Sequence, residues 1–116
     1  MKREREYSDY VRDIMEYTQK IEKFVGNVDF NDFVKNEEKV LAITHSLQII
    51  GEATKHIPKS VRNQYTHIPW EDIIGMRNFI VHGYFVVDVE IVWKTIKDDL
   101  PILENAMKEV LKDLER

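Results

Sequence analysis

The chain has 116 residues, of which 43% are hydrophobic and 33% are charged, and its formal net charge at pH 7 is −4. These values suit one compact domain over residues 1–116 and disfavour two domains with separate cores. No stretch approaches the 18 apolar residues of a membrane span, and the first residues lack the apolar run of a signal peptide, so we expect a cytoplasmic protein without a membrane partner. Without cysteine it has no disulfides and no thiolate zinc site. Because the net charge gives no overall attraction to nucleic acid, any RNA contact requires a local patch.

Two long helices are predicted in the first half of the chain. The first begins near Ser8 or Asp9, which are suitable N-caps, and ends at Gly26. Its apolar stripe is Tyr10, Ile14, Tyr17, Ile21 and Phe24. Residues 28–36 form a connection with one short turn, and a second helix runs from about Glu37 until Pro58 stops it. Its stripe is Val40, Ile43, Leu47, Ile50, Thr54 and Ile57.

The second half predicts two more helices. Residues 58–67 can be a loop or a short helical turn. Pro69 suits a first helical position, so a third helix is expected from about Pro69 to Val81, with His82-Gly83 as its end. Asp88 is a suitable N-cap for a fourth helix, which Pro101 should kink or split. The apolar stripe of that helix is Val89, Val92, Ile96, Leu100, Leu103, Met107, Val110 and Leu114.

One passage allows a different interpretation. Residues 79–93 are rich in Val, Ile and aromatic residues, a composition that favours two strands joined at His82-Gly83. A lone two-stranded ribbon is marginally stable, whereas an antiparallel helical bundle uses every apolar stripe. The sequence therefore predicts an all-α fold, an antiparallel bundle of four to five main helices.

The residues with the most chemical potential lie between Met76 and Tyr84. This stretch contains a guanidinium (Arg77), an amide (Asn78), an imidazole (His82), a glycine (Gly83) and a phenol (Tyr84). On one straight helix Arg77 and Tyr84 share a face, while His82 lies beside Asn78, whose amide can fix the imidazole's orientation. Arg77 and His82 then meet only if the chain leaves helical geometry at Gly83, or if two protomers share one cleft. We favour the shared cleft.

An imidazole and a guanidinium together suit phosphodiester cleavage. Histidine moves protons near neutral pH, and the planar fork of arginine matches phosphate oxygens. His82 would deprotonate a ribose 2′-hydroxyl for attack on the adjacent phosphate while Arg77 stabilises the growing negative charge, without a metal or other cofactor. DNA, which lacks the 2′-hydroxyl, would not be a substrate. Taken singly, Arg77 can be an ion-pair partner and His82-Gly83 a helix end.

Two further features of the sequence each allow a functional and a purely structural interpretation. His45, His56 and His67 recur every 11 residues, but Pro58 interrupts the helix between them and no carboxylate cluster accompanies them, so we predict no metal site. Gly51, within a helix, indicates a close helix crossing. Glu52 beside it is either a partner of Arg77 or His82, or a surface residue.

Several motifs of the chain resemble the HepT-like branch of the HEPN superfamily over residues 5–115. They are Ile50-Gly51-Glu52-Ala53, Ile68-Pro69-Trp70, Ile74-Gly75-Met76-Arg77-Asn78, Ile80-Val81-His82-Gly83-Tyr84-Phe85, Val92-Trp93 and Asp99-Leu100-Pro101. The resemblance implies a homodimeric helical bundle that acts as a metal-independent RNase toxin of a type VII toxin–antitoxin system. It also implies that Arg77 and His82 are catalytic, with Asn78 as a helper and Gly83 completing the motif.

The same resemblance implies a partner. The tyrosine of the motif, here Tyr84, corresponds to the residue that a minimal nucleotidyltransferase antitoxin modifies with AMP groups from ATP. Each AMP would bring a negative phosphodiester beside Arg77 and occupy the place of the RNA phosphate. One alternative from another functional class stays open: a non-catalytic HEPN bundle that binds a nucleotide or serves as the substrate-binding partner of a nucleotidyltransferase.

Overall fold

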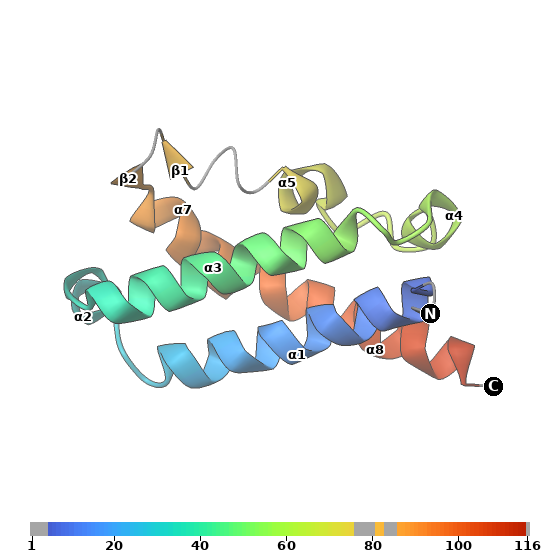
Figure 1. Cartoon of the computed structure of the whole chain (residues 1–116), viewed down its shortest axis with the longest axis horizontal. Helices are drawn as coiled ribbons and strands as arrows, with labels where there is room; N and C mark the ends of the chain where they lie inside the picture. The colour runs from blue at the N-terminus through green and yellow to red at the C-terminus, as the bar shows by residue number, and fades with distance from the viewer. Residues whose placement is uncertain (1–4, 76–80, 83–85, 116) are drawn as a thin grey trace.

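Three long helices form the body of the protein. The computed structural model describes residues 5–75, 81–82 and 86–115. In it α1 (Tyr7–Val25) runs antiparallel to both α3 (Glu37–Thr54) and α8 (Leu100–Leu114), as Figure 1 shows. The short helix α2 (Phe30–Lys35) covers one end of this bundle, and α4 (Lys59–Arg62) lies at the opposite end. The predicted all-α bundle is confirmed.

Polar side chains fix where several helices begin. Asp29 accepts a hydrogen bond from the Asp32 N–H at the start of α2, and Asn36 accepts one from the Lys39 N–H at the start of α3. At the start of α1 the carboxylate of Asp9 accepts from the Glu6 N–H at 3.0 Å. These bonds satisfy N–H groups that have no partner within their helix. The connection predicted over residues 28–36 is therefore mostly the capped helix α2.

The core lies between α1, α3 and α8. All six residues of the stripe predicted for the second helix are buried, although α3 itself ends at Thr54. The stripe predicted for the first helix is partly wrong, because Tyr10 and Tyr17 are half-buried and Phe24 is 37% exposed. Helix α1 packs against two helices at once, and this turns a neighbouring face inward. Its buried residues are Val11, Ile14, Thr18, Ile21 and Val25.

The third predicted helix, from about Pro69 to Val81, is wrong at its C-terminal end, where Val81 lies in a strand. Helix α5 spans only Trp70–Ile74, and Val81–His82 form a strand, β1, that pairs antiparallel with β2 (Val86–Val87). The strand interpretation is correct for these two pairs, Val81 with Val87 and His82 with Val86. It fails from Val89 onward, where the chain is helical again. Beta-branched residues suit the extended backbone here, and the hairpin need not be stable alone because the bundle supports it.

The last predicted helix is present in three pieces. Asp88 is its N-cap, as predicted, and accepts from the Ile91 N–H at 3.2 Å. Helix α7 (Val89–Lys94) leads into a π-helical segment, Thr95–Asp99, and then into α8. Pro101, at the start of α8, has no N–H to donate, and its ring clashes with the carbonyl four residues earlier, so the regular helix is interrupted just before it. The predicted stripe is buried from Val92 to Val110, while Val89 is half-buried and Leu114 is 38% exposed.

Helices α3 and α5 cross at Gly51. A Cβ atom built on Gly51 would lie 2.8 Å from the carbonyl oxygen of Ile73. Real Cβ atoms essentially never come so close to a backbone oxygen, so only glycine permits this approach. The close crossing predicted at Gly51 is confirmed, and its partner is the helix that leads into the Met76–Tyr84 stretch. None of the helices among the described residues is long and apolar enough to span a membrane.

Replacing Gly51 by alanine should destabilise the protein. Alanine in an ordinary helix is about 1 kcal/mol more favourable than glycine, so the sign of the effect is diagnostic. Here the added methyl must push α5 away, and we expect a loss of about 1 to 3 kcal/mol in the free energy of unfolding, measured by urea denaturation. Glu52→Ala, one residue away on the exposed face, should change it by less than about 0.5 kcal/mol. Equal or greater stability of Gly51→Ala would contradict the crossing.

Two carboxyl groups meet between α1 and α8. Glu22 hydrogen-bonds Glu104, and this bond, together with burial and the charge of Glu104, raises the pKa of Glu22. The opposing effect of Lys108 is smaller, although its amine lies 3.2 Å from Glu104. The folded protein therefore holds a proton at this pair more tightly than the unfolded chain does. The stabilisation is complete below the unfolded pKa of about 4.3 and is lost as the pH rises through the raised value.

Glu22→Gln should therefore raise the melting temperature at pH 7 and leave it nearly unchanged at about pH 3, where Glu22 is largely protonated in both states. The reason is that Gln donates a hydrogen bond to Glu104 without adding a second negative charge. Glu16→Gln on the same helix is the matched control, since it removes an exposed carboxylate that pairs with Lys20 at 3.6 Å. It should give no gain at pH 7. A gain of the same size in both variants would point to net charge alone.

Candidate functional site

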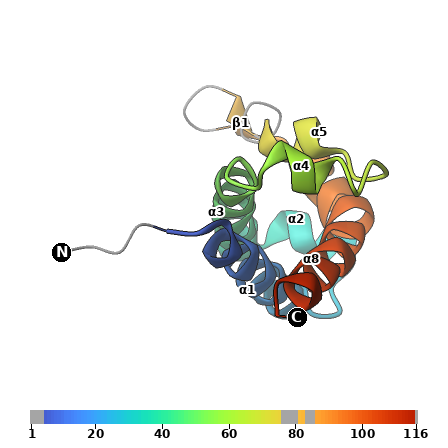
Figure 2. The same cartoon turned by 90° about the vertical axis from the view of Figure 1, so that its right-hand side faces the viewer.

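The stretch from Met76 to Tyr84 lies between helices α5 and α7 along the chain. The chain enters it from α5 and leaves it through β2 and α7, and Figure 2 shows β1 and α5 on the same side of the bundle, above α3. Of the stretch itself the structure describes the backbone of Val81 and His82, in β1. His82 pairs there with Val86. Arg77, Asn78, Gly83 and Tyr84, and the imidazole of His82, lie outside the described residues, so their roles stay predictions.

The position of His82 in a strand changes the geometry expected for the site. The predicted contact between the Asn78 amide and the His82 imidazole required one continuous helix through both residues. His82 lies in a strand, so that helix does not reach it. The same helix carried the argument that Arg77 and His82 diverge within one chain and meet only across two protomers. With His82 in β1, helical phase no longer favours a shared cleft over a site within one chain.

Helix α5 is fixed from both sides. The indole N–H of Trp70 donates to the carbonyl oxygens of Arg62, at 3.0 Å, and Tyr65, at 3.1 Å. Ile73, three residues later, is buried against Gly51 of α3. The start of the candidate site is thus tied to the α4 segment and to the centre of the bundle, and such rigid support is what a precisely positioned site requires.

Glu52 is exposed on α3, and its carboxylate lies 3.1 Å from the amine of Lys55. This ion pair supports the interpretation of Glu52 as a surface residue. A contact with Arg77 or His82 would involve side chains outside the part of the chain that the structure describes, and it stays a prediction.

A cleft of about 320 Å³ lies between α5 and the α7 segment, the two elements that flank the candidate stretch along the chain. Its polar lining includes Asp72, Lys94 and Asp99, and its apolar walls include Ile73 and Ile91. Burial raises the pKa of Asp99, and the negative charges of Asp98 and Asp72 raise it further, whereas Lys94 lowers it. This carboxyl can therefore hold a proton at a higher pH than an ordinary aspartate.

Sequence reasoning did not single out Asp72 or Lys94 and quoted Asp99 only within a motif. Pro101 was the feature of the sequence that could have pointed to Asp99. A proline interrupts a regular helix, and the π-helical segment before Pro101 contains Asp99. Irregular helical turns of this kind often occur at functional sites.

The recurring histidines have no arrangement that suits a metal. Among the described residues no three His, Cys, Asp or Glu side chains are grouped to hold an ion. The ring of His56 is instead stacked on that of Tyr10, with centroids 4.1 Å apart and planes at 10°. This contact joins the start of α1 to the end of α3, so His56 has a structural explanation.

Comparison with known proteins identifies the family. A model of the ribonuclease HepT-like family matches residues 14–110, which include α5, the whole of the Met76–Tyr84 stretch and most of α8. The chain belongs to the HepT-like ribonuclease family.

Several relatives resemble this HepT-like chain over nearly its whole length. It is 38% identical over 108 residues to "Probable ribonuclease HepT" of Thermococcus cleftensis, covering 93% of the chain and 98% of that relative. It is 40% identical over 112 residues to a "Putative RNase" of Caldanaerobacter subterraneus, covering 97% of each. A "Putative RNase" of Methanocaldococcus jannaschii is 37% identical over 111 residues, covering 96% and 92%. No solved structure matches the chain.

Proposed function

We infer that this HepT-like protein is a metal-independent endoribonuclease, the toxin of a type VII toxin–antitoxin system in the cytoplasm. The observation that carries this inference is the family match across residues 14–110, which contains Arg77 and His82. The names of the relatives point to RNA as the class of substrate. The anchored helices on either side of the Met76–Tyr84 stretch are consistent with a positioned catalytic site.

The proposed reaction is an internal transesterification of RNA. His82 takes the proton of a ribose 2′-hydroxyl, whose oxygen then forms a bond to the adjacent phosphorus. The bond from phosphorus to the 5′-oxygen breaks, and that oxygen receives a proton from an imidazolium or from water. Arg77 stabilises the negative charge that develops on the non-bridging oxygens, and Asn78 orients a reacting group. The products are a 2′,3′-cyclic phosphate and a free 5′-hydroxyl, and DNA is not cleaved.

A minimal nucleotidyltransferase antitoxin neutralises the toxin in this proposal. The phenol oxygen of Tyr84 attacks the α-phosphorus of ATP, forming an oxygen–phosphorus bond and releasing pyrophosphate. The attached AMP carries a negative phosphodiester and a base, which exclude the RNA phosphate from Arg77. Gly83, between His82 and Tyr84, belongs to the same motif in this proposal.

We also expect a homodimer, on the basis of the family resemblance alone. Each protomer then contributes one Arg77 and one His82 to a two-fold cleft. Sedimentation equilibrium of the purified chain tests this part separately from catalysis.

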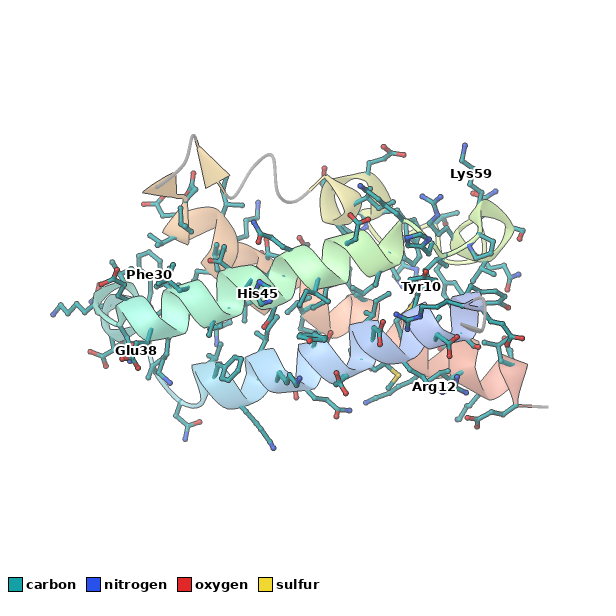
Figure 3. All side chains as sticks on the ribbon, viewed as in Figure 1. Tyr10, Arg12, Phe30, Glu38, His45 and Lys59 are labelled. Carbon is teal, nitrogen blue, oxygen red and sulfur yellow. The ribbon has the colours of Figure 1, made fainter. Side chains whose placement is uncertain are left out.

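His82→Ala should reduce RNA cleavage about 10²- to 10⁴-fold, the usual contribution of a general base. Cleavage by the unmodified protein should proceed in EDTA and leave 2′,3′-cyclic phosphate ends, detected by mass spectrometry of the fragments. His45→Ala is the matched control, because His45 is exposed on α3 (Figure 3). It should retain full activity. Intact RNA in every sample, with Tyr84 confirmed as unmodified, would favour a non-catalytic nucleotide-binding bundle instead.

Tyr84→Phe should remain toxic in the presence of the antitoxin, because it lacks the oxygen that accepts AMP. Growth of cells that express both proteins measures toxicity, and intact-mass analysis measures AMP addition. Tyr17→Phe, at a half-buried position on α1, should still be modified and neutralised. Neutralisation of Tyr84→Phe would show that the antitoxin acts by binding or at another residue.

A further inference from the structure

The charges of this acidic protein are unevenly distributed along the chain. Residues 53–70 contain no Asp or Glu, so all 21 acidic residues lie elsewhere. The same segment contains Lys55, Lys59 and Arg62, together with two histidines. It forms α4 and its flanking turns at one end of the bundle (Figure 1). This segment is therefore a local group of positive charges, although Glu109 and Asp113 of α8 lie near enough to act on its Tyr65.

Two of these cations are available to a ligand. Lys59 is exposed and extends away from α4 on the side of the bundle where α5 lies (Figure 3). Within the described ranges, neither Lys59 nor Arg62 lies within 4.0 Å of a carboxylate oxygen in an ion pair. Lys55 differs, because it already pairs with Glu52 at 3.1 Å. Among the described residues, Lys59 and Arg62 are thus two cations without an ion pair that lie on one short helix.

Arg62 is also held in place before any ligand arrives. Its Nε–H donates to the carbonyl oxygen of Ile57 at 3.0 Å, and the side chain is half-buried. This bond fixes the base of the guanidinium fork and leaves the terminal nitrogens as further donors. A cation positioned in this way loses less side-chain entropy when it binds a phosphate.

The side chains of Lys59 and Arg62 line a hollow of about 330 Å³ between α4 and α5. Asn63 adds an exposed amide on the α4 side, and Trp70 contributes an aromatic wall whose indole N–H is already bonded to the backbone. The opposite edge carries Glu71 and Asp72. Those carboxylates repel a phosphate from the α5 side and confine it to the α4 side, where Lys59, Arg62 and Asn63 offer donors.

We propose that Lys59, Arg62 and Asn63, with the wall of Trp70, form an RNA-backbone surface that binds phosphates of a single-stranded segment beside the cleavage site. The choice of RNA as the ligand rests on the proposed ribonuclease function. The positive side chains bind two phosphates, and the indole face packs against a ribose or base between them.

The surface is connected to the candidate catalytic stretch through α5. Helix α5 begins at Trp70, in the hollow, and ends at Ile74, just before Met76. Pro69 and Asp72 line both this hollow and the cleft between α5 and α7. The surface thus lies at the start of the helix that leads to the candidate site, while Glu71 and Asp72 keep the RNA backbone on the α4 side. It contributes to substrate binding and not to the chemical step.

The test measures binding separately from cleavage. The probe is a fluorescent single-stranded RNA of about 15 nucleotides, 2′-O-methylated throughout so that no 2′-hydroxyl can attack. Fluorescence anisotropy gives its affinity at several salt concentrations. In Lys59→Gln/Arg62→Gln we expect about tenfold weaker binding at low salt and a salt slope reduced by about 1.4, or about 0.7 for each lost phosphate contact. With cleavable RNA, KM should rise while kcat stays nearly constant.

Lys35→Gln is the matched control, because Lys35 is an exposed helical lysine on α2 at the opposite end of the bundle. It should change neither affinity nor slope. Lys59→Glu alone keeps the Arg62 bond to Ile57 and should weaken binding more than Lys59→Gln, which tests the surface even where Arg62→Gln perturbs folding. An unchanged affinity in both Lys59 variants, or an equal loss in Lys35→Gln, would overturn the proposal. Loss of binding in a protein that cleaves no RNA would support the surface while refuting the ribonuclease function.

Discussion

The contact between Gly51 and the carbonyl oxygen of Ile73 is the constraint on which the arrangement of the candidate site depends. It allows α5 to lie directly on the backbone of α3, the most buried helix of the bundle. The connection that follows α5 then starts from a fixed point and not from a loose loop. Trp70 fixes the other end of α5 through two hydrogen bonds, one to the last residue of α4 and one to Tyr65 just after it. A short helix of five residues has little stability of its own, so its position is a product of these contacts.

Under the proposed function, a protein of net negative charge must bind RNA through a local group of positive side chains. Most exposed helical surfaces carry acidic or mixed charge, which reduces non-specific binding to nucleic acid and keeps the protein soluble. Lys59 and Arg62, which have no ion pair among the described residues, lie on the short α4 segment, beside the helix that leads to the candidate site. Binding then depends on a few positioned contacts, whereas a strongly basic protein would bind RNA over much of its surface.

The sequence was most informative where local chemistry decides the structure. Asp88 was recognisable as an N-cap and Pro101 as an interruption, because capping and the missing N–H of proline act within a few residues. The buried stripe of α3 was recognisable because that helix is covered along one continuous face. The predicted buried face of α1 was partly wrong, because α1 packs against two helices and these contacts decide which of its residues are buried. Prediction also failed at Val81, where the helix expected from Pro69 is replaced by a strand that pairs with a segment later in the chain.

By itself the sequence determined the helical class, the glycine required at a close crossing, and the group of residues from Arg77 to Tyr84 that identifies the family. These follow from periodicity, steric demand and residue chemistry, which are properties of neighbours along the chain. Only the tertiary structure decided that His82 belongs to a hairpin, that Asp72 and Asp99 line one cleft, and that Lys59 and Arg62 line one hollow with Trp70. Those relations join segments that are separated along the chain, and the packing of α5 against the bundle brings them together.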